Sequence, residues 1–259
     1  MRVFRLPLVA AVVALLVSLG GLGCSGGSTV TPYEFKDFSR LDIQNAFDVD
    51  VVQSGTFSIV VTSSKALLDY LSVIQEGETV TVKLSPNHPF TDFVLMRKIL
   101  KAKVTMPVLR GLALSGASRA GVRGFESASP IDILVSGAST VELHGVETGD
   151  AKLGVSGASF LNGKLTAADA EFVISGASRV ELAGAAEDVT LEASGASRLN
   201  LEDFVNKTAD VTLSGASQVT IDTRQHLDIA LSGASRLFFL SNPKMGKMEV
   251  LGASTVKHK

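Results

Sequence analysis

Apolar and polar residues alternate in short blocks throughout the second half of the chain. Each block places an apolar residue at every second position, as Leu112 and Leu114 or Ile133 and Val135 do. A second block, such as Thr140-Val141-Glu142-Leu143, follows four residues later. Successive side chains of a strand point to opposite faces, so this pattern predicts short strands with one buried face.

The tetrapeptide Ser-Gly-Ala-Ser stands between the paired blocks. Its copies begin at Ser115, Ser136, Ser156, Ser175, Ser194, Ser214 and Ser232, and Leu-Gly-Ala-Ser begins at Leu251. The steps between copies are 21, 20, 19, 19, 20, 18 and 19 residues. A nearly constant period is typical of repeat proteins, in which each unit buries its apolar face by stacking on its neighbours.

Two short strands and a turn within about 20 residues suit one coil of a parallel β-helix. We therefore predict an all-β fold with a right-handed parallel β-helix, or solenoid, of about eight coils with about 20 residues per coil. Its coils should lie about 4.8 Å apart. A sandwich of hairpins would need turns such as Asn-Gly or Asp-Gly between strands, and the residues flanking Ser-Gly-Ala-Ser contain none.

The tetrapeptide is expected to form the corner between two strands. Glycine would supply a backbone conformation closed to other residues or permit close approach of the next coil. Alanine would fill the inside of the bend, and serine hydroxyls would bond backbone groups or the serine of the next coil. A nucleophilic serine is disfavoured, because seven equivalent serines share only four histidines, which lie at unrelated positions of the repeat.

The first half of the chain lacks the tetrapeptide but is rich in predicted strands. Residues 48–53, 57–61, 79–84 and 101–106 read as strands, and residues 85–97 read as a loop. The helical spacing of Leu67, Leu68, Leu71 and Ile74 predicts a short helix. We expect residues 34–110 to form the strand-rich N-terminal part of the domain and residues 111–259 to form the β-helix.

The N-terminus has the pattern of an export signal. Arg2 and Arg5 precede an apolar run over residues 6–19, and small residues precede Cys24. We predict a lipoprotein-type signal peptide over residues 1–23 and a flexible tether over residues 24–33. Cys24 is the only cysteine, which excludes an internal disulfide, and its setting resembles the lipobox of bacterial lipoproteins.

The lipobox resemblance implies that Cys24 is the lipid attachment site, and the serine that follows it favours the outer membrane. The alternative is an ordinary secretory signal followed by an unmodified thiol. Whether the protein faces the periplasm or the cell surface stays open.

Charge and composition narrow the classes of partner. The chain has 24 basic and 26 acidic residues, a formal charge of −2, and no basic stripe, which argues against nucleic acid. Its single cysteine and scattered acids predict no metal site, and we expect no cofactor. The chain has no tryptophan and two tyrosines, whereas sugar-binding surfaces usually rely on these residues.

One candidate binding face follows the corners. Arg179 and Glu181 lie next to Arg198 in the repeat, and Arg236 occupies the same repeat position in a later coil. Such a face could bind acidic sugars, phosphate groups or a protein. The alternative interpretation is a solvated β-face with ion pairs between coils.

The chain as a whole resembles the bacterial "putative auto-transporter adhesin, head GIN domain" family. The resemblance rests on FSRLDIQNAFDVDVVQSG, SSKALLDYLSVIQEGETVTVKL, the VTMPVLRGLALSGAS junction and the tetrapeptide series, and it covers nearly all of residues 35–257. It implies an exported β-helical domain, often anchored in the envelope, with no established reaction.

These observations together predict a non-catalytic envelope protein of structural or adhesin-like character. It would be exported and anchored through its N-terminal lipid, and it would present a repetitive surface to a cell-surface glycan or protein. The alternative is a β-helix protein that binds or cleaves polysaccharide, since such proteins use the flank of a β-helix for this purpose.

Overall fold

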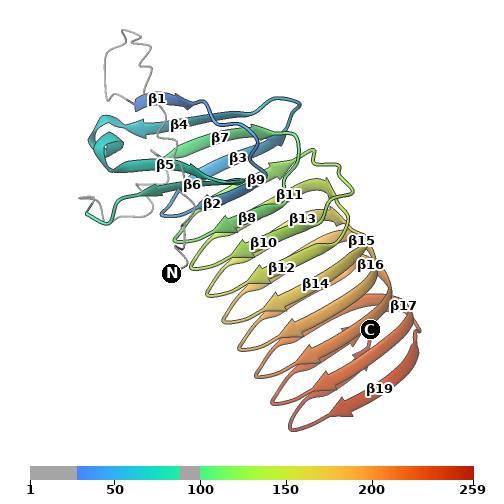
Figure 1. The fold of residues 1–259 in the computed structure, drawn as a ribbon. Helices are drawn as coiled ribbons and strands as arrows, with labels where there is room; N and C mark the ends of the chain where they lie inside the picture. The colour runs from blue at the N-terminus through green and yellow to red at the C-terminus, as the bar shows by residue number, and fades with distance from the viewer. Residues whose placement is uncertain (1–27, 88–99) are drawn as a thin grey trace, which may run out of the picture.

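The computed structural model describes residues 28–87 and 100–259, and it forms a β-solenoid of about seven turns that are about 20 residues apart (Figure 1). The predicted all-β solenoid is confirmed. Most turns contain one strand on each of two faces, joined by the Ser-Gly-Ala-Ser corner. The shorter strands of the solenoid are β8 (Gly111–Leu114), β9 (Arg119–Arg123), β10 (Ile131–Val135), β11 (Thr140–Glu147), β12 (Ala151–Val155), β13 (Phe160–Thr166) and β14 (Asp169–Ile174).

Three long strands and four short ones complete the solenoid. They are β15 (Arg179–Ala193), β16 (Arg198–Leu213), β17 (Gln218–Leu231), β18 (Arg236–Phe239), β19 (Lys244–Val250) and β20 (Thr255–His258), preceded near the N-terminus by β2 (Arg40–Ile43). Each coil has a second bend, which joins the strand after one Ser-Gly-Ala-Ser corner to the strand before the next, and the sequence predicts a turn there. In β15, β16 and β17 the chain instead stays extended through this bend. Each of these strands therefore contributes to both faces.

Backbone hydrogen bonds between strands in strict register join the coils. Every neighbouring pair in the solenoid is parallel, and equivalent repeat positions lie opposite each other, as Leu153 does Phe172. Apolar residues at alternate positions fill the interior, and Phe172 packs edge-on against Phe204 with ring centroids 5.9 Å apart. The alternation in the sequence therefore becomes a continuous apolar core along the solenoid axis.

The corner glycines have the predicted backbone conformation. Gly176 has a φ of 74°, and a Cβ atom placed on it would lie 2.5 Å from the carbonyl oxygen of Gly157 in the preceding coil. The Ala177 N–H donates to the same oxygen at 2.8 Å. Glycine is therefore required both for its positive φ and for the close approach of successive corners.

The expected placement of alanine inside the bend is wrong. Ala177 is exposed, whereas Ser178 is 2 % exposed and donates from its hydroxyl to the Ser175 carbonyl at 2.8 Å. The same contact recurs at Ser118, Ser197, Ser217 and Ser235. The second serine occupies the inside because its hydroxyl satisfies a carbonyl that a methyl group would leave unpaired.

The N-terminal part supplies a first coil without the tetrapeptide. Strand β2, residues 44–47 and strand β3 (Asp48–Gln53) stack in parallel on β8 and β9. Asn45 stands where the later coils have glycine, and its φ is 70°. Asparagine tolerates this left-handed conformation better than most residues, which explains how the corner forms there.

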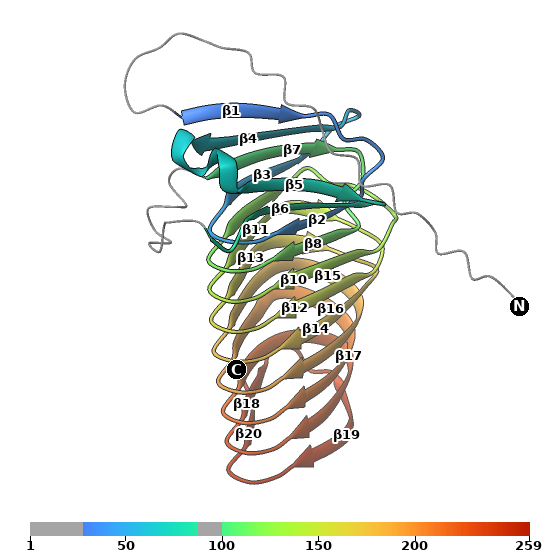
Figure 2. The ribbon, with the colours of Figure 1, turned by 60° about the vertical axis from the view of Figure 1, so that its left-hand side comes forward.

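Further strands cover the other side of this first coil. Strands β6 (Thr79–Leu84) and β7 (Lys101–Met106) pair in parallel with β2 and β3, so the first coil lies between two later ones. Strand β5 (Leu71–Glu76) pairs antiparallel with β6, and β4 (Ser58–Ser64) pairs antiparallel with β7. Figure 2 shows these strands gathered at one end of the solenoid.

A short helical segment joins the two faces at this end. The 3-10 helix η1 (Lys65–Tyr70) connects β4 to β5, and its Leu67 is fully buried in the core. The predicted helix is therefore shorter than expected, because Leu71 and Ile74 belong to β5 and pair with β6. We refer to β1, β4, β5 and η1 as the cap.

The predicted tether is wrong over its second half. Residues 28–33 form strand β1 (Ser28–Tyr33), which pairs antiparallel with β4. The predicted signal peptide, Cys24 and most of the predicted loop over 85–97 lie outside the described residues.

Candidate functional site

The two faces of the solenoid carry different charges. The face built by β10, β12, β14 and the second halves of β15, β16 and β17 presents seven carboxylates and one lysine. We call it the acidic face, and its charged residues are Asp132, Lys152, Asp169, Glu171, Asp188, Glu192, Asp210 and Asp228. The opposite face begins directly after each corner and carries most of the arginines.

The predicted binding residues lie on this opposite face. Arg179 and Arg198 are partners in adjacent strands, and Gln218 separates Arg198 from Arg236. Adjacent strands lie about 4.8 Å apart, so the three arginines occupy one line about 15 Å long. We call Arg179, Arg198 and Arg236 the arginine ladder. The structure brings Arg179, Glu181 and Arg198 together and places Arg236 two strands beyond Arg198.

Arg179 is partly occupied by its neighbours. Its Nε donates to Glu181 Oε1 at 2.6 Å, and its guanidinium carbon lies 5.7 Å from the centroid of the Phe160 ring. Both contacts involve exposed or half-buried groups, so they orient the guanidinium more than they stabilise the fold. Arg198 and Arg236 form no ion pair with any residue in 28–87 or 100–259.

A hollow that the sequence did not reveal lies on the same face near the cap. It has a volume of about 640 Å³, and its lining includes Lys101, Lys103, Arg119, Asp48 and Asp50 from strands β7, β9 and β3. Gly121 also lines it, at the position where the next coil has Glu142. The missing side chain at Gly121 was the one signal of this hollow in the sequence.

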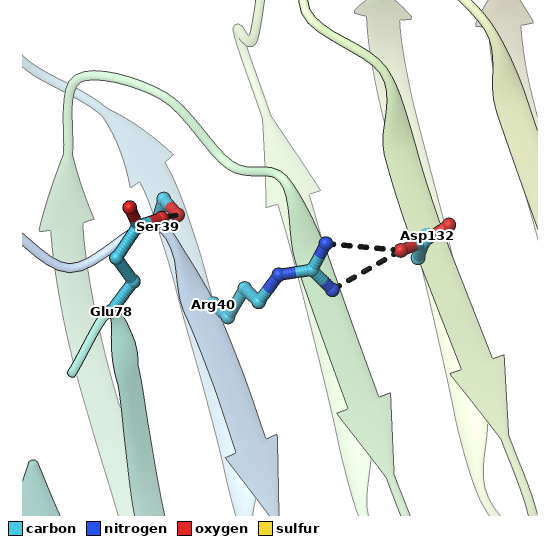
Figure 3. A network of polar contacts seen from close by, with 4 residues as sticks. All are labelled: Ser39, Arg40, Glu78 and Asp132. Carbon is cyan, nitrogen blue, oxygen red and sulfur yellow. Dashed lines mark hydrogen bonds and ion pairs between the residues drawn. The ribbon is translucent and has the colours of Figure 1, made fainter. Parts of the chain in front are cut away.

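Another hollow, on the face that carries β10, is lined in part by an ion pair that spans three strands. Arg40 on β2 passes over Gly111 on β8 and reaches Asp132 on β10, with both terminal nitrogens 3.1 Å from Asp132 Oδ2 (Figure 3). A Cβ atom on Gly111 would lie 2.8 Å from one of these nitrogens. The adjoining hollow of about 340 Å³ is mostly apolar and includes Ala113 and Leu134.

The single lysine of the acidic face is held by its carboxylates. Lys152 Nζ donates to Glu171 Oε1 at 2.6 Å, and this hydrogen bond raises the pKa of Lys152, with Asp132 and Glu192 adding to the effect. Lys152 therefore keeps its proton, and its pair with Glu171, to a higher pH than an isolated lysine would. Both groups are exposed, so the contact contributes little to stability.

Two kinds of polar grouping are absent from the described residues. In residues 28–87 and 100–259, no three His, Cys, Asp or Glu side chains could hold a metal ion. The hydrogen bonds of these residues include none between a corner serine and a histidine. No helical segment of the described chain could span a bilayer.

Comparison with known families identifies the group to which the chain is related. The family model described as "Putative auto-transporter adhesin, head GIN domain" matches residues 37–243. The chain belongs to this family. The match includes the first coil, the cap strands β4 and β5, and all the solenoid except its last coil, so the GIN-domain resemblance noted in the sequence is confirmed.

Solved structures share the GIN-domain fold. A putative adhesin from Parabacteroides distasonis is 17 % identical, with a TM-score of 0.80 over 90 % of this chain and 98 % of that one. A putative adhesin from Parabacteroides merdae is 18 % identical, with a TM-score of 0.75 over 90 % and 97 %.

A putative lipid binding protein from Parabacteroides distasonis is 15 % identical, with a TM-score of 0.75 over 90 % of this chain and 97 % of that one. At these identities the likeness establishes the fold alone. A comparison with curated protein sequences gives no match.

Proposed function

We propose that this chain is an exported, non-catalytic, adhesin-like protein that binds its partner through the arginine ladder. The observation that carries the proposal is the register of the solenoid, which fixes three arginines in one line on one face. Membership of the adhesin family supports the same function.

Rigid placement of the arginines favours multivalent contact. Backbone pairing between strands fixes the spacing of their Cα atoms, so binding requires ordering of the arginine side chains but not of the backbone. A guanidinium binds carboxylate, sulfate and phosphate groups through paired hydrogen bonds. The partner we propose is therefore a cell-surface glycan or protein that carries acidic groups at a comparable spacing.

We further propose that Cys24 is acylated and anchors the protein in the outer membrane. The basic residues, apolar run and single cysteine at the N-terminus support this anchor. Protease and antibody accessibility on intact cells, compared with a Cys24→Ser variant, tests it. Exposure that depends on Cys24 is expected, and protection until the outer membrane is broken would oppose the adhesin function.

The arginine ladder is tested by adhesion of cells that display the full chain. The variant Arg179→Gln/Arg198→Gln/Arg236→Gln should reduce adhesion by at least about tenfold, because charge-assisted hydrogen bonds contribute roughly 1.5–3 kcal/mol each. The matched control removes three charges from the acidic face through Glu192→Gln/Asp210→Asn/Asp228→Asn. Equal adhesion by both variants, at equal display, would contradict the proposal.

A further inference from the structure

The last coil exposes apolar side chains at repeat positions that are buried in the coil before it. Met248 and Val250 pair with Ile229 and Leu231, each of which is 2 % exposed, yet they are 51 % and 40 % exposed themselves. Leu251 is 55 % exposed at the corner position where the seven other copies have serine. Three large apolar side chains are thus exposed within residues 248–251, and a group of this kind is typical of a surface that another molecule covers.

The same coil is rich in lysine. Residues 244–259 contain four lysines and one glutamate, a formal charge of +3, whereas the whole chain carries −2. Lys259 binds Glu202 and Lys247 lies 3.9 Å from Glu249, but Lys244 and Lys257 form no ion pair within residues 28–87 and 100–259. We call Lys244, Lys247, Met248, Val250, Leu251 and Lys257 the cationic tip.

Two kinds of protein contact fit the cationic tip poorly. The outer edges of β19 and β20 have no strand partner among the described residues, but the register of β19 against β17 shifts between Met245 and Met248, where Asp228 accepts the Lys247 N–H. Edge lysines and such irregularities oppose strand addition. A second copy would bring another +3 against the first, and like charges repel.

We propose that the cationic tip docks on the surface of an anionic lipid bilayer. Exposed apolar side chains together with lysines are the combination that favours the boundary between lipid headgroups and acyl chains. The lysines would bind lipid phosphates while Leu251 and Met248 bury part of their surface. The unpaired backbone groups of the edge would stay at headgroup depth, where water satisfies them.

The cationic tip lies at the end of the solenoid opposite the cap, as the positions of β1 and β20 in Figure 2 show. Seven turns at about 4.8 Å separate the two ends by roughly 35 Å. Residues that precede β1 include Cys24. The proposed contact thus lies at the end of the solenoid opposite β1, the strand that follows Cys24 in the sequence, and it does not rest on the arginine ladder.

A single fluorescent label tests the docking in the full chain. Because Cys24 is the only cysteine, Cys24→Ser/Leu251→Cys carries one site for an environment-sensitive dye. The matched control is Cys24→Ser/Ser136→Cys, which labels the equivalent corner position six coils away. We expect the emission at 251 to shift to the blue with vesicles of phosphatidylcholine and phosphatidylglycerol, and the emission at 136 to stay unchanged.

Variants in which lysines are replaced by uncharged glutamines separate electrostatic docking from general hydrophobic adsorption. Lys244→Gln/Lys247→Gln/Lys257→Gln should weaken the response at 251 by on the order of 100-fold, and added salt should weaken it too. Neutralising three cations of the hollow near the cap, through Lys101→Gln/Lys103→Gln/Arg119→Gln, should change it by less than about threefold.

Four outcomes would overturn the proposal. They are no shift at 251, an equal shift with phosphatidylcholine alone, an equal shift at 136, and a shift without vesicles that grows with protein concentration. The last would show that a second copy covers the cationic tip. Thermal unfolding of every variant identifies any that fails to fold, and the label at 251 without lysine changes then decides the question.

Discussion

Residue 176 illustrates how closely successive corners approach each other. Valine at this position would place Cβ 2.5 Å from the Gly157 carbonyl oxygen and would also have to adopt a φ of 74°. We expect Gly176→Val to lower the free energy of unfolding by about 3 kcal/mol or more. Gly55→Val is the control, because no atom lies within 4 Å of its added Cβ. Denaturant titration measures both, and equal stability would refute the corner geometry.

The inward placement of the second corner serine gives a further prediction at this scale. Ser178→Ala removes the hydroxyl that donates to the Ser175 carbonyl and should cost about 1 kcal/mol. Ala177→Asn should change stability by less than about 0.5 kcal/mol, because Ala177 is exposed. The reverse order of these two effects in urea unfolding would place alanine, not serine, inside the bend.

At the scale of elements, η1 and its Leu67 close one end of the core. Leu67→Ala should destabilise the protein by roughly 2–5 kcal/mol, because Leu67 is fully buried where β4 turns into β5. Asp69→Ala in the same segment is the control, since Asp69 is exposed and should tolerate the change. Calorimetric melting of both variants checks this, and a neutral Leu67→Ala would mean that the cap contributes little.

The sequence predicts elements well where the repeat dictates them. Equal spacing of apolar positions requires each coil to repeat its predecessor, so the paired strands beside each corner follow from the period, but the extension of β15, β16 and β17 through the second bend does not. Leu71 and Ile74 were assigned to a helix because their spacing from Leu67 suits one, but pairing of β5 with β6 overrides that local preference. Alternation of apolar and polar residues breaks at a corner, so it could not tell which small residue points inward.

Candidate binding sites that depend on contacts between segments distant in the sequence could not be predicted from the sequence. The arginine ladder follows from repeat positions, and the register of the strands confirms its alignment. The hollow over Gly121 did not follow, because Lys101 and Lys103 reach it only through the pairing of β7 with β3. The binding roles assigned to Arg179, Glu181, Arg198 and Arg236 stay predictions.

The whole molecule is held together mainly by contacts between neighbouring coils. Stability in such a fold is close to a sum over coils and their interfaces. We expect amide hydrogen exchange to be fastest in β19 and β20, which pair with one neighbour each, and to slow toward β12 and β14. Mass spectrometry of exchanged peptides measures this gradient, and uniform protection along the solenoid would show that the coils open as one unit.

Strands β2 and β3 lie between β6–β7 on one side and β8–β9 on the other, and this position constrains the order in which the coils can form. Strands β2 and β3 have neighbours on both sides only when the chain is available as far as the end of β9. Each later coil pairs with the coil before it, so the rest of the solenoid can fold one coil at a time from the N-terminal end. Adding or removing one repeat leaves the contacts within the other coils unchanged. The length of the solenoid can therefore change in evolution by single repeats.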